Sequence, residues 1–214
     1  MIITIDGPGG AGKSTVARRL AAATGCRFLD TGAMYRAVAY AYARQRPADL
    51  DAFLAGLSLN VSFDATTYVV LNGENISEKI RTPEIALLAS SLSQEPGIRA
   101  YLTRMQRQAA ESGGIVAEGR DTGSVVFPDA DIKFYLDADI AERARRRHAE
   151  LAAAGPHEDL GRVREEMERR DRADSERDIA PLVRPKGALY VDTTGKTIDE
   201  VVDELKAHVR EAMR

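Results

Sequence analysis

The sequence of 214 residues predicts an α/β fold, with helices on both faces of a parallel five-stranded sheet. Short apolar runs that are typical of buried strands lie at 1–5, 27–30, 115–118, 132–136 and 188–192. Segments with helical periodicity separate these runs, which is the pattern of a parallel sheet covered on both sides. In addition, a glycine-rich loop joins the first run to the first helix.

Composition indicates one globular unit and excludes several classes of protein. Hydrophobic residues make up 44% and charged residues 29%, which is ordinary for a soluble protein, and the length suits a single core. No apolar run is long enough to cross a bilayer, and Asp6 breaks the apolar start too early for a signal peptide. We therefore expect a cytoplasmic protein with no membrane partner. The net charge of −3 argues against nonspecific nucleic-acid binding, and the single cysteine excludes an internal disulfide.

The loop after the first strand matches the phosphate-binding pattern G-x-x-x-x-G-K-[ST]. Its residues are Gly7, Pro8, Gly9, Gly10, Ala11, Gly12, Lys13, Ser14 and Thr15. In such a loop the backbone surrounds a polyphosphate, Lys13 neutralises its charge, and Ser14 offers a hydroxyl to Mg²⁺. A glycine turn without function is the alternative, but the complete pattern lies between a strand and a helix, as the motif requires. The sequence therefore predicts a sheet of the P-loop NTPase type.

Other local signals place the remaining elements. Thr31 is expected to cap a helix that continues to about residue 45, and a short helical pattern covers 49–57. The β-rich stretch from 59 to 76 contains the turn Asn72-Gly73, which predicts a small antiparallel insert. Further helices are predicted from 83 to 93, from 96 to about 111, and after the capping box at Thr197 and Glu200.

The segment from 141 to 178 is dense in charge and poor in large apolar residues, and Ala154-Gly155-Pro156 interrupts it. Two solvated helices that form a mobile helical lid would have this composition. Arg170, Asp174 and Arg177 have the spacing of one helix face and could converge on an anion, although a solvated stripe of ion pairs is the plain alternative. The same two interpretations apply to the arginines at 143, 145, 146 and 147.

Ligands of a parallel α/β sheet bind beyond the carboxyl ends of its strands. The loops at these ends carry the glycine motif, Asp30-Thr31 with Arg36, and Glu118-Gly119-Arg120-Asp121. We therefore expect all three to face one crevice. Arg36 could bind a phosphate or lie exposed on its helix. Arg120 and Asp121 could act on a ligand or form a local ion pair.

Two functional classes share the glycine motif: a kinase for a small acceptor and a switch or motor that hydrolyses its nucleotide. The guanine-reading pattern N-K-x-D of small G-proteins is absent, and so is the apolar run ending in a lone Asp that motors use. The run IVAE ends instead in Glu118, which could still assist Mg²⁺. The charged segment and the insert favour a kinase, because such parts exclude water from a site with two substrates.

Four motifs together resemble the bacterial cytidylate kinase (CMP kinase) family of nucleoside monophosphate kinases: DGPGGAGKST, LDTGAMYR, EGRDTG followed by VVFPDA, and DIAPL. The resemblance extends from Met1 to the last helix. It implies one domain, with a core at 1–58, 83–140 and 179–214, an insert at about 59–82 and a lid at about 141–178. It also implies transfer of the γ-phosphoryl group of ATP to CMP or dCMP with Mg²⁺, giving ADP and CDP or dCDP in pyrimidine metabolism.

The resemblance also implies roles for individual residues. Gly7 to Thr15 would hold the ATP phosphates, with Ser14 at the metal, and Thr31 stands where some relatives have serine. Arg36 and Arg120 would bind the acceptor phosphate, while Ser90, Arg99 and Asp121 would read cytosine. The chemistry is reasonable because a carboxylate accepts from the amino group on C4, which uracil lacks.

The resemblance further implies that the acceptor site is completed by Arg170, Asp174 and Arg177. The transferring group would be stabilised by Lys13, Arg120, Arg170 and Arg177. The partners are then small molecules, and the expected state is a monomer. A kinase for another monophosphate or for shikimate remains the alternative within enzymes.

Overall fold

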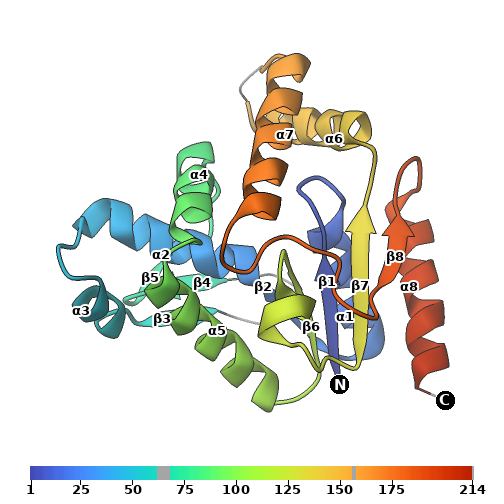
Figure 1. The fold of residues 1–214 in the computed structure, drawn as a ribbon, viewed down its shortest axis with the longest axis horizontal. Coiled ribbons are helices and arrows are strands. Elements are labelled where there is room, and N and C mark those ends of the chain that lie inside the picture. The colour runs from blue at the N-terminus through green and yellow to red at the C-terminus, as the bar shows by residue number, and fades with distance from the viewer. Residues whose placement is uncertain (62–67, 156–157, 214) are drawn as a thin grey trace.

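A computed structural model describes residues 1–61, 68–155 and 158–213 and confirms the α/β fold (Figure 1). Its main sheet contains parallel strands in the order β2-β6-β1-β7-β8. The strands are β1 (Ile2–Asp6), β2 (Arg27–Asp30), β6 (Ile115–Gly119), β7 (Ile132–Asp137) and β8 (Leu189–Asp192). In this register Asp6 pairs with Gly119 and Asp30 pairs with Glu118, so these strands end together at one edge of the sheet.

Helices cover both faces of this sheet, as predicted. Helices α1 (Lys13–Thr24) and α8 (Ile198–Ala212) pack on the face that presents Ile3, Ile5 and Phe134. Helices α2 (Thr31–Gln45) and α5 (Pro96–Glu111) belong to a second core on the other face, which includes Ile115 and Ala117. Each fully buried isoleucine contributes roughly 1.5–3 kcal/mol of transfer free energy. Successive residues of β2 and β6 contribute to opposite cores, so these strands are buried on both faces.

The predicted insert is a separate antiparallel sheet in the order β3-β4-β5. Its strands are β3 (Leu59–Val61), β4 (Val69–Leu71) and β5 (Glu74–Asn75), with helix α3 (Leu50–Ala55) before them and α4 (Pro83–Leu92) after them. Asn72 and Gly73 both have positive φ angles, of 49° and 83°, as a two-residue hairpin turn requires. Part of the predicted β run, residues 62–67, lies outside the described residues.

The charged segment forms two helices, α6 (Ile140–Ala154) and α7 (Leu160–Glu176), which pack against each other and project above the main sheet (Figure 1). Ala144, Val163 and Met167 form a small apolar cluster between them. One detail of the prediction is wrong. Arg177 follows the last residue of α7 and has extended backbone angles of −67° and 141°, so it does not share a helical face with Arg170. None of the described helices combines the length and apolar character needed to cross a membrane.

The structure corrects one further local prediction and adds one feature that was not predicted. Asp30, not Thr31, caps α2, because its Oδ1 accepts a hydrogen bond of 2.7 Å from the N–H of Ala33. The polar loop after β6 leads into a π-helical turn, η1 (Thr122–Val126), for which the sequence gives no prediction. Asp6 holds this turn, accepting from the backbone N–H of Thr122 at 2.8 Å and of Gly123 at 2.7 Å. Single π-helical turns of this kind occur frequently at functional sites.

Candidate active site

The glycine motif lies between β1 and α1, at the edge of the sheet where the strands end. Gly7 has a φ of 147°, and a Cβ atom there would lie only 1.9 Å from the carbonyl oxygen of Leu136. Gly12 stands at the N-cap of α1 with a φ of 85° and has no side chain to accept from the first-turn N–H groups. These N–H groups and the helix dipole are therefore available to an anion.

Lys13 is buried, and its Nζ donates a hydrogen bond of 2.6 Å to the carbonyl oxygen of Pro8. This contact folds the side chain back over the loop. Burial, together with the nearby positive charge of Arg120, lowers the pKa of Lys13 to about 7. A phosphate bound in the loop would oppose both effects and favour the charged amine. In the rest of the motif, Ala11 is buried and Thr15 is exposed on α1.

Ser14 and Glu118 bring oxygen atoms together beside Lys13. The Ser14 hydroxyl donates to Glu118 Oε1 at 2.5 Å, and burial raises the pKa of Glu118, as does the neighbouring carboxylate of Asp30. Hydroxyl and carboxylate oxygens are ligands that suit a hard cation such as Mg²⁺. The backbone oxygen of Glu118 also accepts from Thr31 Oγ1 at 2.7 Å, so Glu118 connects the glycine motif with the start of α2.

Arg120 joins three separate parts of the chain. Its Nη1 donates to the carbonyl oxygen of Gly7 at 3.0 Å, and its Nε donates to Asp174 Oδ2 at 2.9 Å. Arg143 makes a similar link, because its Nη1 donates to Gly9 O at 3.2 Å and to Asp171 Oδ2 at 2.5 Å. Both arginines therefore tie helix α7 to the glycine motif.

Arg36, Arg120 and Arg170 gather positive charge next to this junction. Arg36 lies 3.4 Å from Asp30 Oδ2, and among the described residues its buried Nε has no hydrogen-bond partner. The side chain of Arg170 is exposed to solvent. Removal of part of its hydration nevertheless lowers its pKa to about 10, and the charges of Arg120 and Arg36 contribute. An anion placed here would relieve this repulsion.

A second, buried network surrounds Asp121. Arg99 donates to Asp121 Oδ2, and the Nη2 of Arg177 lies 3.4 Å from Oδ1. Burial raises the pKa of Asp121, while the two guanidinium groups act in the opposite direction. Arg99 also donates to the carbonyl oxygen of Ser93 at 2.9 Å, and Ser93 Oγ donates to the carbonyl oxygen of Ser90 at 2.7 Å.

The structure thus brings the predicted residues into three adjoining groups. The glycine motif forms the first, Arg36, Arg120 and Arg170 the second, and Arg99, Asp121 and Arg177 the third. Asp174 lies between the second and third, since it pairs with Arg120 and its Oδ1 is 3.9 Å from Arg177. Ser90 lies at the edge of the third group, on the last turn of α4.

Sequence reasoning missed two residues in the third group. The guanidinium carbon of Arg99 lies 5.7 Å from the ring centre of Tyr35, and burial raises the pKa of the Tyr35 hydroxyl to about 12. Tyr35 lies four residues after Thr31, and that helical spacing could have identified it. Ser93 accepts from Arg99 and lies 3.4 Å from Arg177, but no local pattern signals this position.

Comparisons of the sequence with known proteins all indicate the same protein family. A family model described as cytidylate kinase matches residues 3–211. The cytidylate kinase of Geobacter sulfurreducens is 46% identical, with 100% of this chain and 94% of that protein covered. The cytidylate kinase of Syntrophotalea carbinolica is 48% identical, with 99% and 92% covered.

Solved structures show the same fold at lower identity. TT1252 from Thermus thermophilus has a TM-score of 0.53 and 20% identity, with 99% of this chain and 97% of that chain covered. A shikimate kinase from Bacteroides thetaiotaomicron has a TM-score of 0.50 and 14% identity, with 98% of each chain covered. At such identities the likeness concerns the fold alone.

Proposed function

The chain belongs to the cytidylate kinase family, and on this premise we propose that it transfers the γ-phosphoryl group of ATP to CMP or dCMP. The products are ADP and CDP or dCDP, for use in pyrimidine nucleotide metabolism. The observation that carries the proposal is the position of the Arg36, Arg120 and Arg170 cluster, which Arg120 links to the glycine motif through Gly7. Two phosphorylated substrates could therefore meet end to end in one cleft.

The glycine motif, residues 7–15, binds the donor phosphates in this proposal. Backbone N–H groups and Lys13 hold the β- and γ-phosphates, as the free N-terminus of α1 allows. Ser14, with Glu118 beside it, provides the oxygen atoms that would hold Mg²⁺. When bound, Mg²⁺ supplies positive charge to the phosphate oxygens during transfer.

The acceptor phosphate binds Arg36 and Arg120, with Arg170 adding charge from α7. Phosphoryl transfer spreads negative charge over the moving group, so Lys13 and the arginines at 120, 170 and 177 stabilise it electrostatically. Asp174 accepts a hydrogen bond from Arg120, and in this proposal it also accepts from a sugar hydroxyl of the acceptor. No covalent intermediate with the protein is required.

The base is recognised by the buried network around Asp121. The carboxylate accepts from the amino group on C4 of cytosine, while Arg99 and Ser90 donate to the ring nitrogen and carbonyl. Tyr35, already beneath the Arg99 guanidinium, offers an aromatic surface for the ring. Uracil has an acceptor in place of that amino group and would face the Asp121 carboxylate unfavourably.

We assign three parts to the domain: a core at 1–58, 83–140 and 179–214, an insert at about 59–82, and a lid at about 141–178. The separate apolar cluster of Ala144, Val163 and Met167 supports a lid that moves as a unit. Closure over two substrates needs no second chain, so we propose a monomer that acts in the cytoplasm.

A coupled assay of ADP release tests the proposal. The enzyme is supplied with ATP and Mg²⁺, and then with CMP, dCMP, UMP, AMP, shikimate or no acceptor. We expect rapid release only with CMP and dCMP. Preferred use of another acceptor would assign a different kinase, and equal release without an acceptor would assign a nucleotide hydrolase.

A further inference from the structure

A hollow of about 550 Å³ lies between helix α5, the turn η1 and the segment that follows α7. We call it the α5 hollow, and its walls include Arg99, Arg104, Arg107, Glu111, Val125 and Ile179. Its volume is in the range of small-molecule sites. Of the residues assigned to the substrates, only Arg99 lines it, and Arg99 is buried at its wall.

The charge in the α5 hollow is mainly positive. Arg104 and Arg107 are exposed, and in the described part of the chain neither has a carboxylate oxygen within ion-pair distance. The Arg104 guanidinium carbon lies 5.8 Å from the ring centre of Tyr101, and Arg107 donates to the backbone oxygens of Val125 and Val126. Because Arg99 is already paired with Asp121, the two exposed guanidinium groups of Arg104 and Arg107 share the hollow with one carboxylate of its lining, that of Glu111.

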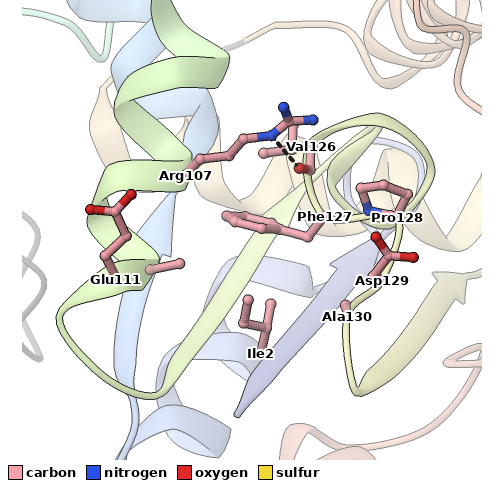
Figure 2. A pocket seen from close by; sticks show the side chains of 9 residues that line it. Ile2, Arg107, Glu111, Val126, Phe127, Pro128, Asp129 and Ala130 are labelled. Atoms are coloured by element: carbon pink, nitrogen blue, oxygen red, sulfur yellow. Dashed lines mark hydrogen bonds between the residues drawn. The ribbon is translucent and has the colours of Figure 1, made fainter.

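Figure 2 shows a neighbouring hollow of about 480 Å³, which shares Arg107 and Glu111 with the first. There Arg107 reaches from α5 to Val126, at a distance of 2.9 Å from its Nε to the carbonyl oxygen. The remaining lining is largely apolar, with Ile2, Phe127 and Pro128, but it also contains Asp129. A phosphate would therefore favour the α5 hollow over this apolar neighbour.

We propose that the α5 hollow is an effector site for a phosphorylated organic molecule of nucleotide size. Its phosphates would lie against Arg104 and Arg107, with Val125 and Ile179 beside them. Arg99 provides the connection to the acceptor site, since it donates to Asp121 and to the carbonyl oxygen of Ser93. An anion in the hollow draws the Arg99 guanidinium away from Asp121 and so weakens acceptor binding. This coupling depends on the role proposed for Arg99 and Asp121, whereas the site itself does not.

Calorimetric titration with inorganic pyrophosphate tests the site. The substrate sites are first filled with ADP and CMP, which cannot react because ADP has no γ-phosphoryl group to transfer. We expect one further binding event, which Arg104→Glu weakens by about tenfold or more because a charge-assisted contact is reversed. Gln108→Glu, a second exposed change on the same wall, weakens it as well, whereas Arg210→Glu on α8 leaves it unchanged. If no further binding event occurs, or if Arg104→Glu and the unaltered protein bind pyrophosphate with equal affinity, the proposed effector site is wrong.

Kinetics test the coupling. At saturating ATP, pyrophosphate should raise the KM for CMP in the unaltered enzyme more than in Arg104→Glu, and without pyrophosphate the two should have the same kcat and KM. An equal response of the two enzymes overturns the coupling. The difference in pyrophosphate affinity between the two proteins can also be measured without nucleotides. A failure of the effector site is therefore distinguishable from a failure of the kinase function.

Discussion

The Nε atom of Arg120 lies 2.9 Å from Oδ2 of Asp174, which joins the loop after β6 to helix α7. Asp174 is buried, and Arg120 in turn contacts the glycine motif at Gly7. Because the two ends of this chain of contacts belong to different substrates in the proposed reaction, loss of Asp174 should affect them unequally.

Asp174→Ala should raise the KM for CMP by about tenfold to a hundredfold, which corresponds to losing a hydrogen bond to a charged group. ADP affinity should change little, because the glycine motif remains intact. Steady-state kinetics and equilibrium titration with ADP measure the two effects. Asp178→Ala, an exposed carboxylate close by in the chain, serves as the control. An equal loss of CMP and ADP binding would contradict the assignment of Asp174 to the acceptor.

Lys13→Ala should lower kcat by at least about a hundredfold, because one preorganised positive charge at the transferring group is lost. The buried position of Lys13 against Pro8 O is the structural reason to expect so large an effect. The exposed Lys186→Ala change should leave kcat unaltered. Retention of most of the activity in Lys13→Ala would remove this residue from the mechanism.

The lowered pKa of Lys13 predicts proton uptake when a nucleotide binds. Since its pKa is about 7 in the folded protein, and ordinarily 10.5, much of the free enzyme at pH 8 to 9 lacks this proton. The negative phosphates of ADP raise the pKa again, so binding takes up as much as about one proton at pH 8 and less at pH 6.

Calorimetry of ADP binding in buffers with different ionisation enthalpies measures this uptake. Lys13→Arg should abolish it, because a guanidinium stays protonated throughout this pH range. A binding enthalpy at pH 8 that does not depend on the buffer would show that Lys13 is already charged in the free enzyme.

Gly7→Ala and Gly113→Ala distinguish two ways in which replacing glycine lowers the free energy of unfolding: backbone strain and a steric clash of the added Cβ atom. Both positions have positive φ, of 147° and 132°, but a Cβ at Gly7 would lie 1.9 Å from Leu136 O, whereas nothing lies within 4 Å at Gly113. Gly113→Ala should lower the free energy of unfolding by about 1–2 kcal/mol, and Gly7→Ala by more than about 3 kcal/mol. Urea denaturation measures both, and equal losses would show that the backbone at Gly7 moves freely.

Much of the fold could be predicted from local sequence. The buried strands are short apolar runs, and the glycine motif predicts the turn between β1 and α1 because positive φ and close approach require glycine there. The turn η1 could not be predicted, since it depends on Asp6, which is 116 residues away from Thr122 in the chain. The sequence predicts Thr31 as the cap of α2, but Asp and Thr both suit that position, and the backbone geometry assigns it to Asp30.

The candidate site was predicted as a set of residues, but its connections were not. The loops at 30–36 and 118–121 lie together because parallel strands end at one edge of the sheet. Helical spacing predicts that Arg177 shares one face of α7 with Arg170 and Asp174, but Arg177 is an extended residue beyond the end of the helix and approaches Asp121 instead. The contacts of Ser93 depend on how α4 and α5 pack, which no local pattern reveals. The roles of these residues in binding and transfer remain predictions.

Recognition of cytosine by Asp121 is the central claim, and substrate discrimination tests it most directly. The measurement is the ratio of kcat/KM for CMP to that for UMP in the unaltered enzyme, in Asp121→Ala and in Asp121→Asn, with folding checked by thermal unfolding. We predict that the ratio falls by about tenfold to a hundredfold in Asp121→Ala, because one base-specific contact is lost. In Asp121→Asn, whose amide can donate to the uracil carbonyl, use of UMP should rise. An unchanged ratio in both folded variants would contradict the claim that Asp121 reads the base.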